Sequence, residues 1–200
     1  MSEPPLCLGT EPARTVASLV GADWLGVPDL RLDAGWSDGS ELEAWRDEVG
    51  SGPPAPAVIV AVWLGAPHRS TLVDTGLETW LATVETPYAL WFAALAAGAR
   101  RCADGGQVIA LADRPAPKDS GGWSAPSAVV DAVEVLVHSL AEVHRPRGIR
   151  INLVTTPARL AGGVEGVADD PATDLAAAVS MLLAADTALT SAVIPLGSGH

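Results

Sequence analysis

The chain has 200 residues, of which 48% are hydrophobic and 18% charged, and its formal net charge is −12. These values predict a single globular domain over residues 1–200 and exclude a disordered chain. The acidic balance disfavours nucleic acid and anionic membranes as partners, because both recruit clustered Lys and Arg.

Cysteine usage and apolar runs bear on the compartment. Cys7 and Cys102 lie far apart and form no C-x-x-C pair, which is typical of reduced, buried thiols in a cytoplasmic protein. No signal peptide is expected at the N-terminus. The longest apolar run, residues 88–97, is shorter than the roughly 20 residues that span a bilayer, so it predicts a buried helix.

Short β-branched runs alternate with longer helical patterns, which is typical of a parallel sheet flanked by helices. In chain order, strands are predicted at residues 5–9, 29–34, 57–63, 107–112, 149–155 and 191–196. Helices are predicted at residues 13–20, 40–49, 77–103, 126–144 and 171–184. The helix at 77–103 should kink or break at Pro87, because an interior proline loses a hydrogen bond and clashes with the preceding turn.

The segment 105–154 carries the most specific motif. It contains a strand, a long helix, and then Gly148-Ile149-Arg150-Ile151-Asn152. This order resembles the short-chain dehydrogenase/reductase (SDR) family, and the resemblance extends over residues 29–199. It implies an α/β fold: a Rossmann-like, doubly wound parallel sheet with helices on both faces.

The positions that carry chemistry in the family hold other residues here. By the resemblance, Trp123 and Ser127 stand at the catalytic Tyr and Lys, Asp113 at the Ser, and Pro87 at the Asn. The chain has one Tyr and one Lys, so no Tyr-x-x-x-Lys motif exists. An indole does not titrate usefully, so Trp123 cannot serve as the general acid/base. Trp123 could instead line a ligand pocket or plug the vacated cleft.

The cofactor positions also depart from the family pattern. The expected glycine-rich turn is Gly9-Thr10-Glu11-Pro12, with one glycine and an acidic residue where phosphates would bind. Ala61-Val62-Trp63-Leu64 stands where the family has Asn-Asn-Ala-Gly. Only about 20 residues separate the turn from Asp29, so the resemblance predicts that one N-terminal strand-helix unit is deleted by comparison with the family. The resemblance therefore implies that no cofactor binds.

A metal site and an acid/base pair are the two other kinds of site to weigh in this sequence. None of the four histidines has a partner at metal-ligand spacing, so no metal is expected. Asp113 follows a strand and His68 lies in the loop after residues 57–63. The two could form a repurposed acid/base pair, or both could be solvated loop residues.

The helices at 77–103 and 126–144 are apolar nearly all the way round, whereas a helix on one sheet face needs only one apolar stripe. The resemblance implies a four-helix interface with a partner subunit; burial within the domain is the alternative. The residues expected at the interface are Trp80, Val84, Tyr88, Trp91, Phe92, Val129, Val133, Leu136, Val137 and Leu140.

These observations favour a catalytically inactive, cytoplasmic SDR-like subunit that pairs with an active NAD(P)-dependent SDR in a hetero-oligomer. Its role would be structural or regulatory, as the non-catalytic subunit of an oxidoreductase complex. The alternative is an enzyme that reuses the cleft for cofactor-free cyclisation, dehydration or aldol-type chemistry on a polyketide or acyl thioester, with Asp113 and His68 as acid and base. A self-associating binding protein is a third possibility.

Overall fold

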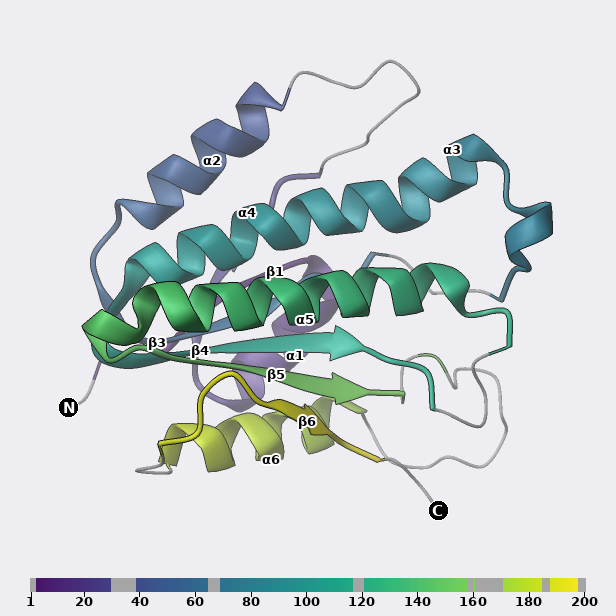
Figure 1. Cartoon of the computed structure of the whole chain (residues 1–200). Helices are drawn as coiled ribbons and strands as arrows, with labels where there is room; N and C mark the ends of the chain where they lie inside the picture. The colour runs from purple at the N-terminus through teal and green to yellow at the C-terminus, as the bar shows by residue number, and fades with distance from the viewer. Residues whose placement is uncertain are drawn as a thin grey trace.

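The computed structural model describes residues 3–29, 39–64, 69–116, 121–157, 160, 171–184 and 188–197. Their strands are β1 (Leu6–Gly9), β2 (Asp23–Gly26), β3 (Ala55–Ala61), β4 (Cys102–Asp113), β5 (Arg150–Thr156) and β6 (Val193–Pro195). Their α-helices are α1 (Arg14–Leu19), α2 (Ser40–Gly50), α3 (Leu77–Trp80), α4 (Thr86–Arg101), α5 (Ser124–His144) and α6 (Pro171–Ala184). These elements form one sheet with a layer of helices on each face (Figure 1).

All described strand pairs are parallel, and the strand order is β2-β1-β3-β4-β5-β6. Parallel neighbours need a crossover between them, and the helices supply it. The chain first builds outward from β1 to β2, then returns to β3 and builds the other way. This confirms the predicted doubly wound α/β sheet.

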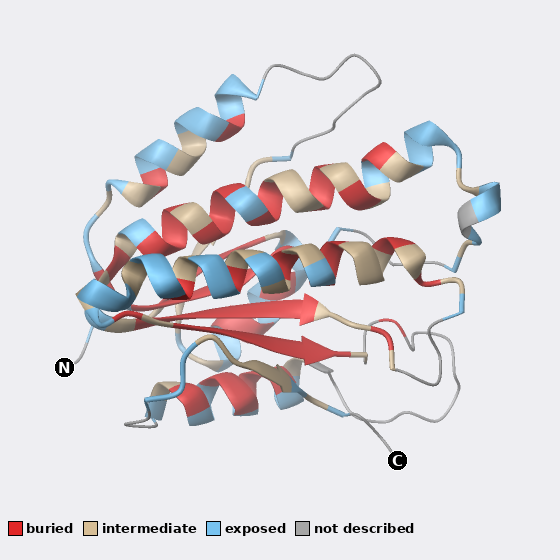
Figure 2. Ribbon diagram, viewed as in Figure 1, coloured by how far each residue is buried: buried red, intermediate tan, exposed pale blue. Residues whose placement is uncertain are grey.

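The sheet is buried on both faces because alternate residues of each strand enter different cores. Val58 and Val60 pack with the layer of α2, α4 and α5, whereas Ile59 and Ala61 pack with α1 and α6. Figure 2 shows the central strands almost wholly buried between the two helical layers. The run AVIVAVW, apolar at every position, fits this two-sided burial.

Pro87 has the predicted effect on its helix. The π-helical turn η3 (Leu81–Glu85) separates α3 from α4, and the amide of Thr86 donates to the carbonyl of Leu81, five residues back. Pro87 follows within the first turn of α4, where its missing N–H costs least. The widened turn thus absorbs the proline without ending the helical path. The helix ends at Arg101, two residues before the predicted end, because β4 begins at Cys102.

The strand β2 was not predicted from the sequence, and its presence changes where the chain is shortened by comparison with the family. β2 (Asp23–Gly26) pairs with β1, although residues 13–28 were predicted to hold only a helix. The first strand-helix-strand unit is therefore present, and the shortening falls after β2, where Val27 to Asp29 form no helix. The predicted strand at residues 29–34 lies, beyond Asp29, outside the described residues.

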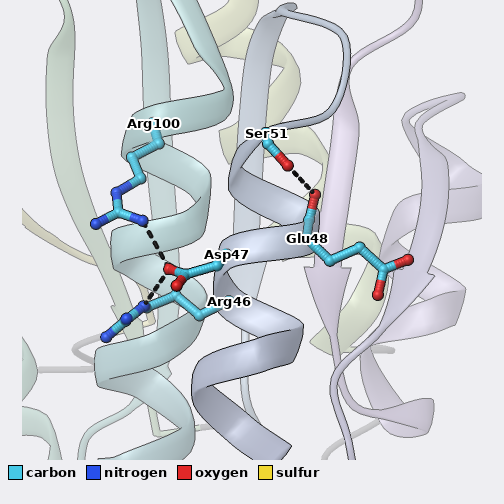
Figure 3. A network of polar contacts seen from close by, with 5 residues as sticks. All are labelled: Arg46, Asp47, Glu48, Ser51 and Arg100. Atoms are coloured by element: carbon cyan, nitrogen blue, oxygen red, sulfur yellow. Dashed lines mark hydrogen bonds and ion pairs between the residues drawn. The ribbon is translucent and has the colours of Figure 1, made fainter.

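A polar network fixes α2 to α4 (Figure 3). The Asp47 carboxylate accepts one hydrogen bond from Arg46 Nε at 3.0 Å and one from Arg100 Nη1 at 2.8 Å. These two bonds, that from Arg46 first, hold the pKa of Asp47 below its usual value. At the end of α2, Ser51 Oγ donates to the carbonyl of Glu48 at 3.0 Å. The network lies at the amino end of the sheet's neighbouring strands, away from the site described below.

Candidate functional site

The strand order reverses between β1 and β3, and α/β folds bind ligands outside the carboxyl ends of strands at such a point. Here the two loops are fastened together. Thr10 Oγ1 accepts a hydrogen bond from the amide of Trp63 and donates one to its carbonyl, each at 2.8 Å. The amide of Thr10 also donates to the carbonyl of Ala61 at 3.1 Å. We call the two Thr10–Trp63 bonds the clasp.

The Trp63 side chain reaches the other way, toward β4. It is only 4% exposed, and its indole Nε1 donates to the carbonyl of Leu111 on β4 at 3.1 Å. The indole therefore spans the carboxyl edge of the sheet from the end of β3 to β4. Sequence comparison had marked the loss of the Asn-Asn-Ala-Gly pattern at this point but not that Trp63 would fill the space.

The turn after β1 does not fit a dinucleotide pyrophosphate, which binds to free backbone amides at a helix N-terminus. The Thr10 amide is bonded to Ala61, Pro12 has no amide hydrogen, and the Ala13 amide donates to the carbonyl of Thr10 at 2.9 Å. Gly9 serves packing instead, since a Cβ there would lie 2.5 Å from the carbonyl oxygen of Ala61. The residues of this turn therefore do not fit a nicotinamide cofactor, and no reaction step in this chain is assigned to one.

A pocket of about 220 Å³ lies beside the closed crevice, at the carboxyl ends of β3 and β4. Its described lining comes from the chain after β3, from η3 and α4, from the end of β4, from the first turns of α5 and from Leu160, beyond β5. The polar side chains in the described lining are Ser70, Thr83 and Asp113, and apolar residues including Trp63 and Trp91 form the rest. In Figure 1 this is the edge toward which the β4 and β5 arrowheads point.

Solved structures with this architecture span nearly the whole chain. A short-chain dehydrogenase/reductase from Serratia marcescens is 17% identical, with a TM-score of 0.68 over 98% of this chain and 96% of that one. A dehydrogenase/reductase from Sinorhizobium meliloti is 17% identical, with a TM-score of 0.65 over 100% and 96%. BdcA, solved in complex with NADPH, is 15% identical, with a TM-score of 0.63 over 98% and 93%. The chain has the SDR fold.

The resemblance to the SDR fold is structural. No protein-family model matches the sequence, and no curated protein matches it either.

Two of the four positions that the sequence resemblance matched to SDR catalytic residues lie on the pocket. Pro87 is buried and Asp113, the last residue of β4, is half-buried, and both line the pocket. Ser127, in the first turn of α5, is half-buried and lies outside the described lining. The expectation that Asp113 is a solvated loop residue is wrong, because strand β4 carries it to the pocket.

Trp123 neither lines the described pocket nor plugs it. It precedes α5 and is 4% exposed, and its backbone bridges to Ser70 beside a bond from the Ser70 amide to the carbonyl of Gly122 at 2.9 Å. The guanidinium of Arg69 lies 5.4 Å from the centre of the indole ring, which is within cation–π range. Trp123 thus supports the loop after β3 and leaves the pocket open.

The proposed partner of Asp113 cannot be placed. His68 lies outside the described residues, so the Asp113–His68 pair stays a prediction. Among the residues that the structure does describe, no three His, Cys, Asp or Glu side chains gather where they could hold a metal ion.

The predicted interface residues divide into two sets. Five of them are buried in the domain's own core and cannot contact a partner: Val84, Trp91, Val129, Val133 and Val137. The other five are exposed or half-buried: Trp80, Tyr88, Phe92, Leu136 and Leu140. Burial within the domain, the alternative explanation, therefore accounts for half of the prediction.

Residues on the solvent side of α4 and α5 keep apolar surface. Phe92 is 49% exposed, Val135 66% and Val143 67%, and the last two were not predicted. We call these three residues the outer residues. Figure 2 shows exposed positions recurring along both helices. By length and hydropathy, Ser124–Arg147 could cross a membrane, but in this fold α5 packs along the sheet.

Proposed function

We propose that this chain is a catalytically inactive, cytoplasmic subunit with the SDR fold. It pairs through the outer residues of α4 and α5 with an active NAD(P)-dependent SDR, in a structural or regulatory role. The observation that carries the proposal is the turn after β1, because the amides of Thr10 and Ala13 are bonded within the protein and Pro12 has no amide hydrogen to offer a dinucleotide pyrophosphate. The two cysteines are buried and unbridged, as is usual in a reducing compartment.

The exposed apolar side chains support the pairing. A soluble domain gains no stability from exposing Phe92, Val135 and Val143 to water. Burying them against another pair of helices is favourable by about 25 cal/mol per Å² of apolar surface. In SDR oligomers these helices meet a partner subunit, so the same surface is suited to that contact. An active partner would supply the Tyr-x-x-x-Lys chemistry that this chain lacks.

Pairing is tested by purifying the tagged chain from its native host. We expect a second chain that carries Tyr-x-x-x-Lys and gives the complex NAD(P)H-dependent activity. Val135→Asp should abolish co-purification, since a carboxylate would be buried without a partner. Leu19→Asp is the matched control, because Leu19 is 54% exposed on α1, on the other face of the sheet. A pure chain that stays a stable monomer and recovers no such partner would refute the proposal.

Cofactor binding is tested separately by thermal melting with NADPH and NADH. A ligand at 100 times its Kd stabilises a protein by about 2.7 kcal/mol, which is roughly 5–11 °C for a domain of this size. We expect no shift at millimolar cofactor, because the amides of Thr10 and Ala13 in the turn after β1 are bonded within the protein. A shift of several degrees would mean that the crevice opens, and the chain would then be a cofactor-binding protein.

Asp113 on the pocket favours one element of the alternative, a cofactor-free enzyme. That function also needs a base in reach of Asp113. Asp113→Asn should abolish any cyclisation, dehydration or aldol-type activity of the pure chain, and an unchanged rate in this variant would exclude the alternative.

A further inference from the structure

The pocket beside the clasp has the size and chemistry of a ligand site in its own right. A cavity of about 150 Å³ accepts benzene, and drug-sized sites begin near 300 Å³. At about 220 Å³, this pocket suits one ring with a short substituent. A polyketide chain would be too long for it.

The described lining offers hydrogen-bond acceptors. Among the described residues of the lining, Asp113 is the one with an ionisable side chain. A carboxylate can accept about four hydrogen bonds, so Asp113 can bind a ligand beside its protein contacts. The carbonyl of Thr83 is a second candidate acceptor. Pro87, one helical turn later, has no N–H to donate to this carbonyl. The hydroxyl of Thr83 is already donated to the carbonyl of Thr79 at 2.7 Å.

The start of α5 does not make the pocket an anion site. Ala125 and Pro126 line it, but Pro126 has no amide hydrogen to donate. The partial positive charge of the helix N-terminus lies on the same pocket as the Asp113 carboxylate and is offset by its full negative charge. Trp63 and Trp91 add apolar walls to the lining.

We propose that this pocket binds a single-ring molecule that carries a hydrogen-bond donor, with a protonated amine preferred, and that the donor bonds to Asp113. The ring lies against the apolar walls formed by α4, α5 and Trp63. The proposal does not depend on subunit pairing, because the outer residues face away from the pocket and contribute nothing to its lining.

Three probes of similar size show whether the pocket prefers a cation, a neutral molecule or an anion: benzylamine, benzyl alcohol and benzoate. Binding is followed by titration calorimetry and by the NMR signal of the Trp63 indole N–H. We expect a Kd on the order of 0.1–1 mM for benzylamine, as for a ligand of about eight non-hydrogen atoms. Benzyl alcohol should bind several-fold more weakly, and benzoate should not bind.

Variants locate the site. Asp113→Asn should weaken benzylamine binding about ten-fold and benzyl alcohol binding less, because a charge-assisted hydrogen bond is roughly twice as strong as a neutral one. Asp131→Asn is the control, since its carboxylate is 68% exposed on α5 and pairs with Arg114 at 3.4 Å. It tests whether benzylamine is attracted merely to the acidic surface.

Ala82→Phe tests the cavity itself. Ala82 is exposed and lines the pocket, so a larger side chain should fill the pocket from the rim without disturbing the core. Loss of binding in this variant, with its melting temperature retained, is the expected result. Benzoate binding as tightly as benzylamine, benzylamine binding unaffected by Ala82→Phe, or the absence of binding by all three probes would each overturn the proposal.

Discussion

Replacing Thr10 by Val tests whether the clasp holds the crevice shut. Valine keeps the shape of threonine but can neither accept from the Trp63 amide nor donate to its carbonyl, so two 2.8 Å bonds are lost. Each contributes about 0.5–1.5 kcal/mol, and a donor left unsatisfied in a buried site costs about 1–3 kcal/mol. Trp63 is only 4% exposed and Thr10 is half-buried, so water can replace the lost hydroxyl only in part.

We therefore expect Thr10→Val to lower the free energy of unfolding by about 1–3 kcal/mol. For a domain of this size a loss of about 2 kcal/mol lowers the melting temperature by roughly 4–8 °C. Urea unfolding followed by circular dichroism measures the change. Thr15→Val is the matched control, because Thr15 is exposed on α1, where the same substitution should stay within about 0.5 kcal/mol. Equal losses in the two variants would refute the clasp.

Three further predictions concern the turn after α5. Arg147→Gln should destabilise the fold by about 1–3 kcal/mol in urea unfolding, because Arg147 bonds one carboxylate and two carbonyls at 2.6–3.1 Å; Arg145→Gln, which loses one exposed pair, should not. Burial, and then the Arg147 cation, lower the pKa of His144. The unfolded chain therefore takes up this proton first, and stability falls as pH drops through about 6.5 toward the lower folded value. His144→Gln should flatten that part of the pH–stability profile, and an unchanged slope would contradict the assignment. Gly148→Ala should cost about 1–2 kcal/mol, since residue 148 has φ 67°, and a neutral melting temperature would count against it.

The sheet and its long helices were predictable because burial determines their pattern. The all-apolar run at residues 57–63 became the two-sided strand β3, and the helix predicted at 171–184 matches α6. The strand β2 was missed because its four residues are exposed or half-buried, so the sequence DWLG shows no apolar alternation. Its position at the sheet edge comes from the pairing with β1, which a local pattern does not encode.

The division of the predicted interface residues into buried and exposed sets has a related reason. Val129, Val133 and Val137 recur every fourth residue and form the stripe that α5 buries on the sheet, whereas Val135, between them in sequence, and Val143, beyond them, are exposed. Counting apolar residues finds both stripes but does not say which one the sheet occupies.

The closed crevice and the open pocket are separate consequences of neighbouring residues. Val62 belongs to the core under α4 and α5, and Trp63, one residue later, belongs to the core with α1 and α6, because consecutive residues in extended chain point to opposite faces. Trp63 packs with α1 and α6 and also forms part of the pocket wall, where the small side chains of Ala112 and Ala125 leave space. Replacing Trp63 by a smaller residue would therefore not recreate an SDR active site. The positions that the resemblance matches to catalytic residues hold Pro87 and Asp113, and these line the pocket. Most of the pocket lining thus comes from the α4/α5 side of the sheet. We expect its ligand to be a molecule that binds without a dinucleotide cofactor.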